Sequence, residues 1–314
     1  MPVSADDLLA APDDDGMAIV WHGLNRGRVT LCAQAAGTLR ILLAHATDHA
    51  RRRQTWGRPI ASRELVLGRL GRIAAAIPAC DALSAWAGWV IDAGLPGELE
   101  AIVAKTTASL AVRDAAFDAL GVHGGRAFLV GHPLGDALHD HLAVTVYEGE
   151  SDLLGLALFK GLSRGHPLAG RRDAPAWRRA ATWLAWRTAA LVPRARARHG
   201  TLFDRRLAGH AAAARRLLDQ TALAIDRAIR RHGRGLAERQ LEIGGLAAIV
   251  RDGLGVLAVA HHADRLADER GLLGADVWCR LALARARGRR LTAADLDAVA
   301  TLGRAVVADA HSAN

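Results

Sequence analysis

The chain has 314 residues, of which 51% are hydrophobic, so it can form one large domain or two ordinary ones with a sizeable core. Aromatic residues make up only 4%, and a core filled mainly by Ala and Leu favours closely packed helices over a β-sandwich. The net charge of +9 comes almost wholly from Arg and attracts anions, but no nucleic-acid-binding motif accompanies it. We therefore expect no nucleic-acid partner, and solvated arginines on helix faces remain the simpler interpretation.

Helical periodicity covers almost every segment of the first half. Apolar residues recur at spacings of three and four along the first long segment, which ends near Pro59 because proline bars Arg58 from helical geometry. Glycine and proline mark the turns that follow. The expected elements are helices over 16–49, 62–93 and 98–120, a turn over 94–97, a loop over 121–136, and helices that begin near 136 and after 149. Long helices with short connections predict an antiparallel four-helix-type bundle.

The second half is also predicted to be helical. A linker over 161–175 separates the halves, so we expect an all-α fold with a bundle over 1–165 and a second helical domain over 166–314. The expected elements are a Trp- and Arg-rich helix over 176–198, a long helix over 202–231, and two or three more, the last opened by the capping sequence at 292–295.

Cysteine and histidine spacings predict neither a disulfide nor a metal site. Cys32, Cys80 and Cys279 are far apart in apolar helical contexts, which is typical of buried free thiols. His45 and His49 have the spacing of a zinc-binding helix, but no third ligand accompanies them, so we expect no metal. The chain opens without a signal peptide and has no run approaching the ~18–20 apolar residues of a membrane span. We expect a cytoplasmic protein, with peripheral membrane contact as an alternative.

Four pieces of sequence carry a family resemblance through their order and spacing. They are LNRGRVTLCAQAAG at 24–37, ARRRQTWGRPI at 50–60, GVHGGRAF at 121–128 and LHDHLAVTVYEGESDLL at 138–154. Together they resemble the C-terminal helical domain of the acyl-CoA dehydrogenases, over about residues 6–162. The family consists of flavoenzymes that desaturate the α,β bond of an acyl-CoA, so the resemblance implies FAD as cofactor and acyl-CoA as substrate.

The resemblance implies a catalytic role for the Tyr-Glu-Gly piece. Glu148 stands where the family has the general base that removes the pro-α proton, a task for which a desolvated carboxylate is suited. Some members carry the base on the first long helix instead, at the position of Gly27, which cannot serve. The implied substrate-binding residues are Asn25, which matches a contact to the coenzyme A arm, Arg28, which packs near the base, and Tyr147 and Gly149, which flank it.

A second set of positions matches flavin contacts in the family. Arg53, Thr55 and Trp56 match residues that reach the flavin dinucleotide of a neighbouring subunit, and Arg can form paired hydrogen bonds with a pyrophosphate. Gly124 and Gly125 match a loop that lets backbone N–H groups approach the same cofactor. Two cofactor positions depart from the family pattern, because Gly121 replaces a glutamine and Glu150 replaces a threonine.

The second half resembles, more loosely, the extra helical domain of the very-long-chain members, which associates with membranes. Its helix over 176–198 has an apolar face and many arginines, which is typical either of a helix at an anionic membrane surface or of one packed on its neighbours. No flavin domains precede the bundle in this sequence. We therefore expect a dehydrogenase-like chain that needs flavin domains from a partner chain or a longer gene product, holds little FAD alone and forms homo-oligomers through the bundle. The alternative is a non-catalytic helical module for dimerisation or membrane association.

Overall fold

The computed structural model describes residues 4, 7, 16–170, 175–191 and 202–312, and the structural statements below concern these residues. The elements of the first half are α1 (Gly16–Arg52), β1 (Gln54–Thr55), β2 (Arg58–Pro59), η3 (Ile60–Ser62), α2 (Glu64–Asp92), α3 (Glu98–His123), η4 (Gly124–Phe128), α4 (Pro133–Asp136), α5 (Leu138–Ala143) and α6 (Ser151–Ser163). Those of the second half are α7 (Pro167–Gly170), α8 (Ala176–Leu191), α9 (Arg205–His232), η5 (Gly233–Glu238), α10 (Gln240–Leu266), α11 (Glu269–Ala286) and α12 (Ala293–Ser312). The all-α prediction is confirmed.

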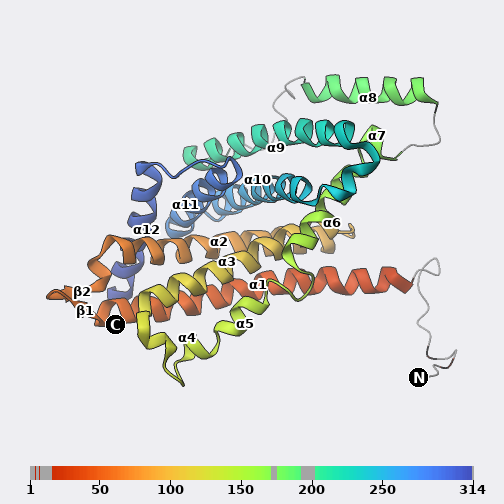
Figure 1. The fold of residues 1–314 in the computed structure, drawn as a ribbon. Coiled ribbons are helices and arrows are strands. Elements are labelled where there is room, and N and C mark those ends of the chain that lie inside the picture. Colours follow the sequence, from red (N-terminus) through yellow and green to blue (C-terminus); the bar gives the residue numbers. More distant parts are fainter. Residues whose placement is uncertain (1–3, 5–6, 8–15, 171–174, 192–201, 313–314) are drawn as a thin grey trace.

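The first three long helices form the centre of the bundle. α1, α2 and α3 lie side by side, each in contact with the other two (Figure 1). Consecutive helices are antiparallel, so α1 and α3 run in the same direction. The two-residue strands β1 and β2 pair as a small antiparallel hairpin between α1 and α2, with Thr55 opposite Arg58. Buried positions on α1 recur at three and four, from Leu31 and Cys32 to Ala46 and Ala50, because one face of this 37-residue helix packs against its neighbours.

The segment expected as a loop is largely helical. α3 continues three residues beyond the predicted end, and Gly124, at φ 62°, then stops it while its N–H binds the Leu120 carbonyl. The next residues form η4, and Pro133 opens α4 at a helix N-terminus, where its missing N–H is harmless. The prediction of a loop over 121–136 is therefore wrong for most of this segment, because its glycines and proline bound short helices rather than exclude them.

The two halves share their hydrophobic core. α10 packs against α6, α2 and α3, while α12 crosses α2 (Figure 1). Two glycines make that crossing close: a Cβ added to Gly303 would lie 2.1 Å from the carbonyl oxygen of Leu67, and one added to Gly71 would lie 2.1 Å from that of Val299. The predicted domain boundary near 165–175 remains a prediction, but residues of both halves contribute to each of two buried clusters.

Four buried carboxylates organise the second half. Asp226 accepts bonds from Arg187, Arg230, His166 and the Trp183 indole N–H, and it fixes α8 on α9. The other three pair with arginines or a histidine in the same manner: Asp252 with Arg251 and Arg285, Asp276 with His210 and Arg280, and Asp295 with Arg280 and Arg289. Buried carboxylates are costly unless they are paired, so these contacts give part of the large arginine content a structural role, although most of these arginines remain partly exposed.

Three helices are long and apolar enough to cross a membrane, judged by length and composition alone. They are Gly16–Arg52, Glu64–Asp92 and Gln240–Leu266, which the search for apolar runs in the sequence had passed over. Between 39% and 56% of each apolar window is buried inside the fold. The apolar residues of α1, α2 and α10 therefore serve, in large part, the core of the helical assembly.

The α2–α12 crossing predicts a sharp difference between two glycine substitutions. We expect Gly303→Ala to lower the free energy of unfolding by about 1–3 kcal/mol, because its methyl group would collide with the Leu67 backbone. Gly245→Ala is the matched control, since nothing lies within 4 Å of the added carbon and alanine favours helix by up to ~1 kcal/mol. Urea denaturation compares the two, and equal stability of both variants would contradict the tight crossing.

Candidate functional site

A strained turn carries Glu148 between α5 and α6. The chain leaves α5 at Ala143, and the Ser151 N–H binds the Thr145 carbonyl, which closes the turn immediately before α6. Glu148 has φ 59°, a left-handed conformation that non-glycine residues adopt rarely and at a cost of ~1–3 kcal/mol. Gly149 follows at φ 104°, and a Cβ there would lie 2.9 Å from the Leu154 side chain. Glycine is therefore required after Glu148, and the local strain marks a functional candidate.

The side chain of Glu148 lies directly on α1, against Gly27. A Cβ added to Gly27 would lie 2.9 Å from Oε1 and 3.0 Å from Oε2 of Glu148, so glycine at this position leaves room for the carboxylate where it lies. Oε2 is buried and has no hydrogen-bond partner among the described residues. A partly buried carboxylate with an oxygen that accepts no hydrogen bond is available to take a proton.

Arg28 brings the other predicted substrate-side residues to this point. Its side chain is buried, its Nε donates to the Glu148 carbonyl oxygen at 3.1 Å, and its Nη1 donates to Asn25 Oδ1 at 3.0 Å. Burial lowers the pKa of Arg28, and the negative charge of Glu148 opposes that shift. The structure thus places Asn25, Arg28 and Glu148 in one hydrogen-bonded group, although 120 residues separate the arginine from the glutamate.

Lys105 is the residue of this group that sequence reasoning missed. It is fully buried in α3, and its Nζ donates to the Gly149 carbonyl at 2.6 Å and to the Thr145 carbonyl at 3.2 Å. The two carbonyls lie on either side of Glu148, so the lysine fixes both ends of the strained turn. Desolvation lowers its pKa to about 8. A signal was present, because Lys105 is one of only two lysines in the chain and stands within an apolar helix.

Glu150 and Tyr147 have different surroundings from Glu148. The Glu150 carboxylate caps α6 by accepting from the backbone N–H groups of Asp152 and Leu153 at 2.9 and 3.0 Å. Burial raises the pKa of Glu150, but these N–H bonds and the charge of Lys105 outweigh it and lower that pKa overall. Tyr147 is 49% exposed beside the catalytic candidate. The predicted contact of Glu150 with a flavin remains a prediction.

Three of the predicted flavin-contacting residues, Arg53, Thr55 and Trp56, lie at the end of the bundle that carries the β-hairpin, whereas Glu150 lies at the start of α6. Arg53 is exposed, and Trp56 is 91% exposed at φ 50°. The Arg63 guanidinium lies 5.2 Å from the Trp56 ring centroid and donates to the Thr55 carbonyl at 2.7 Å, which stabilises the hairpin tip. An exposed indole supported by an arginine is suited to contact a ligand or a second subunit.

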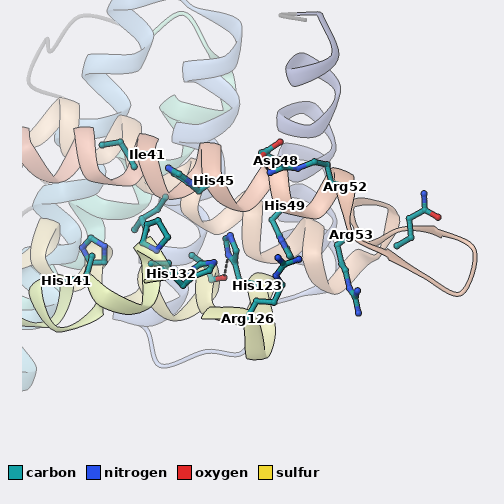
Figure 2. Close-up of a pocket in the computed structure, with 16 residues that line it drawn as sticks. Ile41, His45, Asp48, His49, Arg52, Arg53, His123, Arg126, His132 and His141 are labelled. Carbon is teal, nitrogen blue, oxygen red and sulfur yellow. Dashed lines mark hydrogen bonds and ion pairs between the residues drawn. The ribbon is translucent and has the colours of Figure 1, made fainter. Parts of the chain in front are cut away.

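A cavity of about 810 Å³ lies beside this hairpin, between α1 and the segment from α3 to α5 (Figure 2). The His49 and His123 rings stack at 4.6 Å, and His132 meets His123 edge-on at 5.2 Å. Burial lowers the pKa of both His49 and His123, so these imidazoles are neutral at neutral pH. Three arginines also line the cavity, of which Arg52 is paired with the lining Asp48, while Arg53 and Arg126 add positive charge. No group of metal ligands occurs in the described part of the chain.

The glycines of the predicted dinucleotide loop differ in what surrounds them. A Cβ added to Gly124 or Gly125 would meet nothing within 4 Å, so the backbone there is open to a ligand. A Cβ added to Gly121, in contrast, would lie 2.1 Å from the Arg69 guanidinium. Gly121, which replaces the family's glutamine, thus makes room for the Arg69 side chain from α2.

The amphipathic helix expected over 176–198 is described as far as residue 191. Its inward side bears Trp183 and Arg187, which bind Asp226, while the predicted apolar face points outward, with Trp177 67% and Leu184 57% exposed. Three of the arginines predicted to flank this face, at positions 194, 196 and 198, lie outside the described residues. An outward apolar face is the arrangement that a surface-binding helix requires.

Comparison with known proteins identifies the family. The model of the acyl-CoA dehydrogenase C-terminal domain matches residues 14–162. Residues 14–162 are therefore a C-terminal-type domain of the acyl-CoA dehydrogenase family. The acyl-CoA dehydrogenase of Bacillus subtilis is 34% identical over 157 residues, which are 50% of this chain and 41% of that protein. The resemblance inferred from the four sequence pieces is confirmed.

Acyl-CoA dehydrogenase relatives also resemble the second half. Human mitochondrial very long-chain specific acyl-CoA dehydrogenase is 26% identical over 287 residues, which cover 87% of this chain and 44% of that protein. The fold matches an acyl-CoA dehydrogenase from Bacillus anthracis complexed with FAD, with a TM-score of 0.73, 16% identity, and coverage of 94% of this chain and 56% of the other. The chain thus spans less than half the length of the curated relatives cited.

The buried lysine of this acyl-CoA dehydrogenase-type domain predicts a specific pH dependence of stability. Between its folded pKa of about 8 and its ordinary value of 10.5, unfolded Lys105 binds a proton that folded Lys105 has lost. The free energy of unfolding should therefore rise with pH across this window. Lys105→Met should remove at least about 1 kcal/mol of that rise, as measured by urea denaturation at several pH values.

Lys160→Met is the matched control, because Lys160 is the only other lysine and is exposed. Its stability profile should keep the pH dependence of the unsubstituted protein. If Lys105→Met keeps that dependence as well, the low pKa of Lys105 is wrong.

Proposed function

We propose that this chain provides the catalytic base and part of the substrate wall of an FAD-dependent acyl-CoA dehydrogenase, which converts an acyl-CoA thioester into its α,β-unsaturated form. The observation that carries the proposal is the Glu148 carboxylate packed on Gly27, with a buried oxygen that accepts no hydrogen bond from the described residues. Family membership of residues 14–162 supports it. The whole activity remains a proposal, because the chain spans only part of its relatives.

In this mechanism Glu148 takes the proton from the carbon next to the thioester carbonyl. The strained turn fixes the direction of the carboxylate, and Lys105 and Arg28 keep the turn in place through three backbone carbonyls. Pre-organisation of this kind contributes to the rate because no reorganisation is needed when the proton moves. The flavin, when bound, accepts the hydride that leaves the β carbon. The substrate thus loses one proton and one hydride, and a C=C double bond forms.

We assign the substrate side of the site to the residues around the carboxylate. Asn25 and Arg28 lie on α1 with Gly27 between them, and Tyr147 and Gly149 flank Glu148 on the turn. Arg28 is buried and cationic, which suits it to keep the carboxylate oriented. Tyr147 is half-exposed, which suits it to line the entrance to the site. The coenzyme A arm is proposed to pass Asn25.

The residues at the hairpin end fit the phosphate portion of a flavin dinucleotide. Arg53 is exposed beside a cavity with two further arginines, and Gly124 and Gly125 have open backbone. Arginines and exposed N–H groups are the usual partners of a pyrophosphate. Because the family implies a cofactor shared between subunits, we propose that the bundle forms homo-oligomers or pairs with a flavin-domain chain. We also propose that the chain alone binds FAD weakly, since these residues would contact only its dinucleotide end.

Glu148→Gln tests the catalytic proposal. In the assembled enzyme, acyl-CoA-dependent flavin reduction should fall at least ~10²-fold, because the amide keeps the shape and loses the basicity. Circular dichroism should show an unchanged helical fold. Asp152→Asn is the matched control, since it neutralises an exposed acid four residues away and should keep the normal rate. Flavin reduction by Glu148→Gln at the unsubstituted rate would remove Glu148 as the base.

A second candidate function is association with an anionic membrane surface, as in the non-catalytic alternative. The outward Trp177 and Leu184 on α8 favour it. The double variant Trp177→Ser/Leu184→Ser should reduce flotation of the full chain with anionic liposomes several-fold at low salt, and salt should weaken flotation of the unsubstituted chain. Leu241→Ser, at a leucine 96% exposed on α10, is the control. Equal flotation of both variants would contradict a role for α8.

A further inference from the structure

A second large cavity lies at the junction of the two halves, away from the hairpin end. Its volume is about 950 Å³, and it is enclosed by α6, α7, α8, α9, η5 and α10. α6, α7 and α9 converge there in Figure 1. The cavity uses the C-terminal half of α6, whereas Glu148 precedes the N-terminus of the same helix. It shares no lining residue with the proposed catalytic or flavin-contacting groups.

The floor of this cavity is apolar, and it is built by both halves of the chain. The residues that form it are Leu156, Phe159, Leu168, Ile229, Leu236 and Ile243. Phe159, Ile229 and Ile243 are buried and belong to the main hydrophobic cluster, so the floor is part of the rigid core. Such a surface accommodates an aliphatic chain, and the volume is within the range of cavities that bind small ligands.

The rim of the cavity is strongly cationic. Five basic side chains line it, and none of the described lining residues is acidic: Lys160, Arg164, Arg179, Arg230 and Arg234. Arg230 is neutralised by Asp226 at 3.1 Å, and Arg164 lies 3.5 Å from Glu98. Lys160, Arg179 and Arg234 make no ion pair within the described residues. At least three positive charges therefore face an apolar floor without an acidic partner among the described residues.

One donor on this rim is already desolvated. Arg179 Nε is buried and has no hydrogen-bond partner in the described part of the chain. Buried donors are nearly always paired in folded proteins, so an unpaired guanidinium N–H beside a cavity is a sign of a missing acceptor. Together with the rim charge, it points to an anionic ligand group at the α8 side of the cavity.

We propose that this cavity binds a single-chain anionic lipid, with its acyl chain on the floor and its phosphate or carboxylate head on the rim. A free phosphate would leave the apolar floor unused, and a neutral lipid would leave the arginines and the lysine unpaired. The site is independent of the proposed dehydrogenase activity, because neither Glu148 nor the flavin-contacting residues take part in it.

Isothermal titration of the full chain with lysophosphatidate below its micelle concentration tests the proposal. We expect one site per chain, with binding at least about ten-fold tighter than that of lysophosphatidylcholine with the same acyl chain, whose head has no net charge. Glycerol 3-phosphate, which lacks the chain, should bind at least about a hundred-fold more weakly. A fatty acid and an acyl-CoA of the same chain length show whether a carboxylate or a coenzyme A phosphate also satisfies the rim.

Matched double variants locate the site. Lys160→Gln/Arg234→Gln removes two exposed, unpaired cations from the rim and should weaken lysophosphatidate binding about ten-fold or more. Arg205→Gln/Arg216→Gln removes two exposed cations from α9 outside the cavity and should change binding less than about two-fold. Glu148→Gln should leave it unchanged.

Four results would overturn the proposal. Equal affinity for lysophosphatidate and lysophosphatidylcholine would show that the rim charge plays no part in binding. Equal affinity for lysophosphatidate and glycerol 3-phosphate would show that the apolar floor plays no part. Equal loss in the two double variants would indicate general surface electrostatics. Loss of binding in Glu148→Gln would place the lipid in the proposed catalytic site instead.

Discussion

The ammonium group of Lys105 is the contact on which the candidate site depends. It lies in the interior of α3 and donates to the carbonyls of Thr145 and Gly149, on the two sides of Glu148. Without this donor the Gly149 carbonyl would lose its bond of 2.6 Å, while the Thr145 carbonyl would keep only its bonds from Ser151. A partly buried carbonyl that loses its donor costs free energy. The two hydrogen bonds of Lys105 thus offset part of the cost of burying the lysine and of straining the glutamate. They fix the turn that leads into α6.

Two close approaches at glycine explain how the rest of the molecule is assembled. At Gly27, the missing side chain lets the Glu148 carboxylate lie on α1, which joins the turn to the substrate-side residues Asn25 and Arg28. At Gly303, it lets α12 lie on the backbone of α2, which joins the second half to the bundle. Both contacts bring together segments that are more than one hundred residues apart. In each, a single added methyl group would collide with the neighbouring segment.

The arginine excess is distributed in three ways with different consequences. One part neutralises buried carboxylates such as Asp226 and Asp276 and stabilises the second half. A second part surrounds the cavity near the hairpin, where burial lowers the pKa of His49 and His123. A third part, Arg179 and Arg234, faces the cavity at the junction of the halves without an acidic partner among the described residues. A net charge of +9 is therefore compatible with specific anion sites rather than with a uniformly basic surface.

The sequence by itself determined the all-α class, the order of the long helices and the family, because helical periodicity and the spacing of the four pieces are local or nearly local properties. Only the tertiary structure decided that Glu148 rests on Gly27, that Lys105 fixes its turn, that Gly121 makes room for Arg69, and that the apolar face of α8 points outward. These are contacts between distant segments, and a periodic pattern states which side of a helix is buried without stating what covers it.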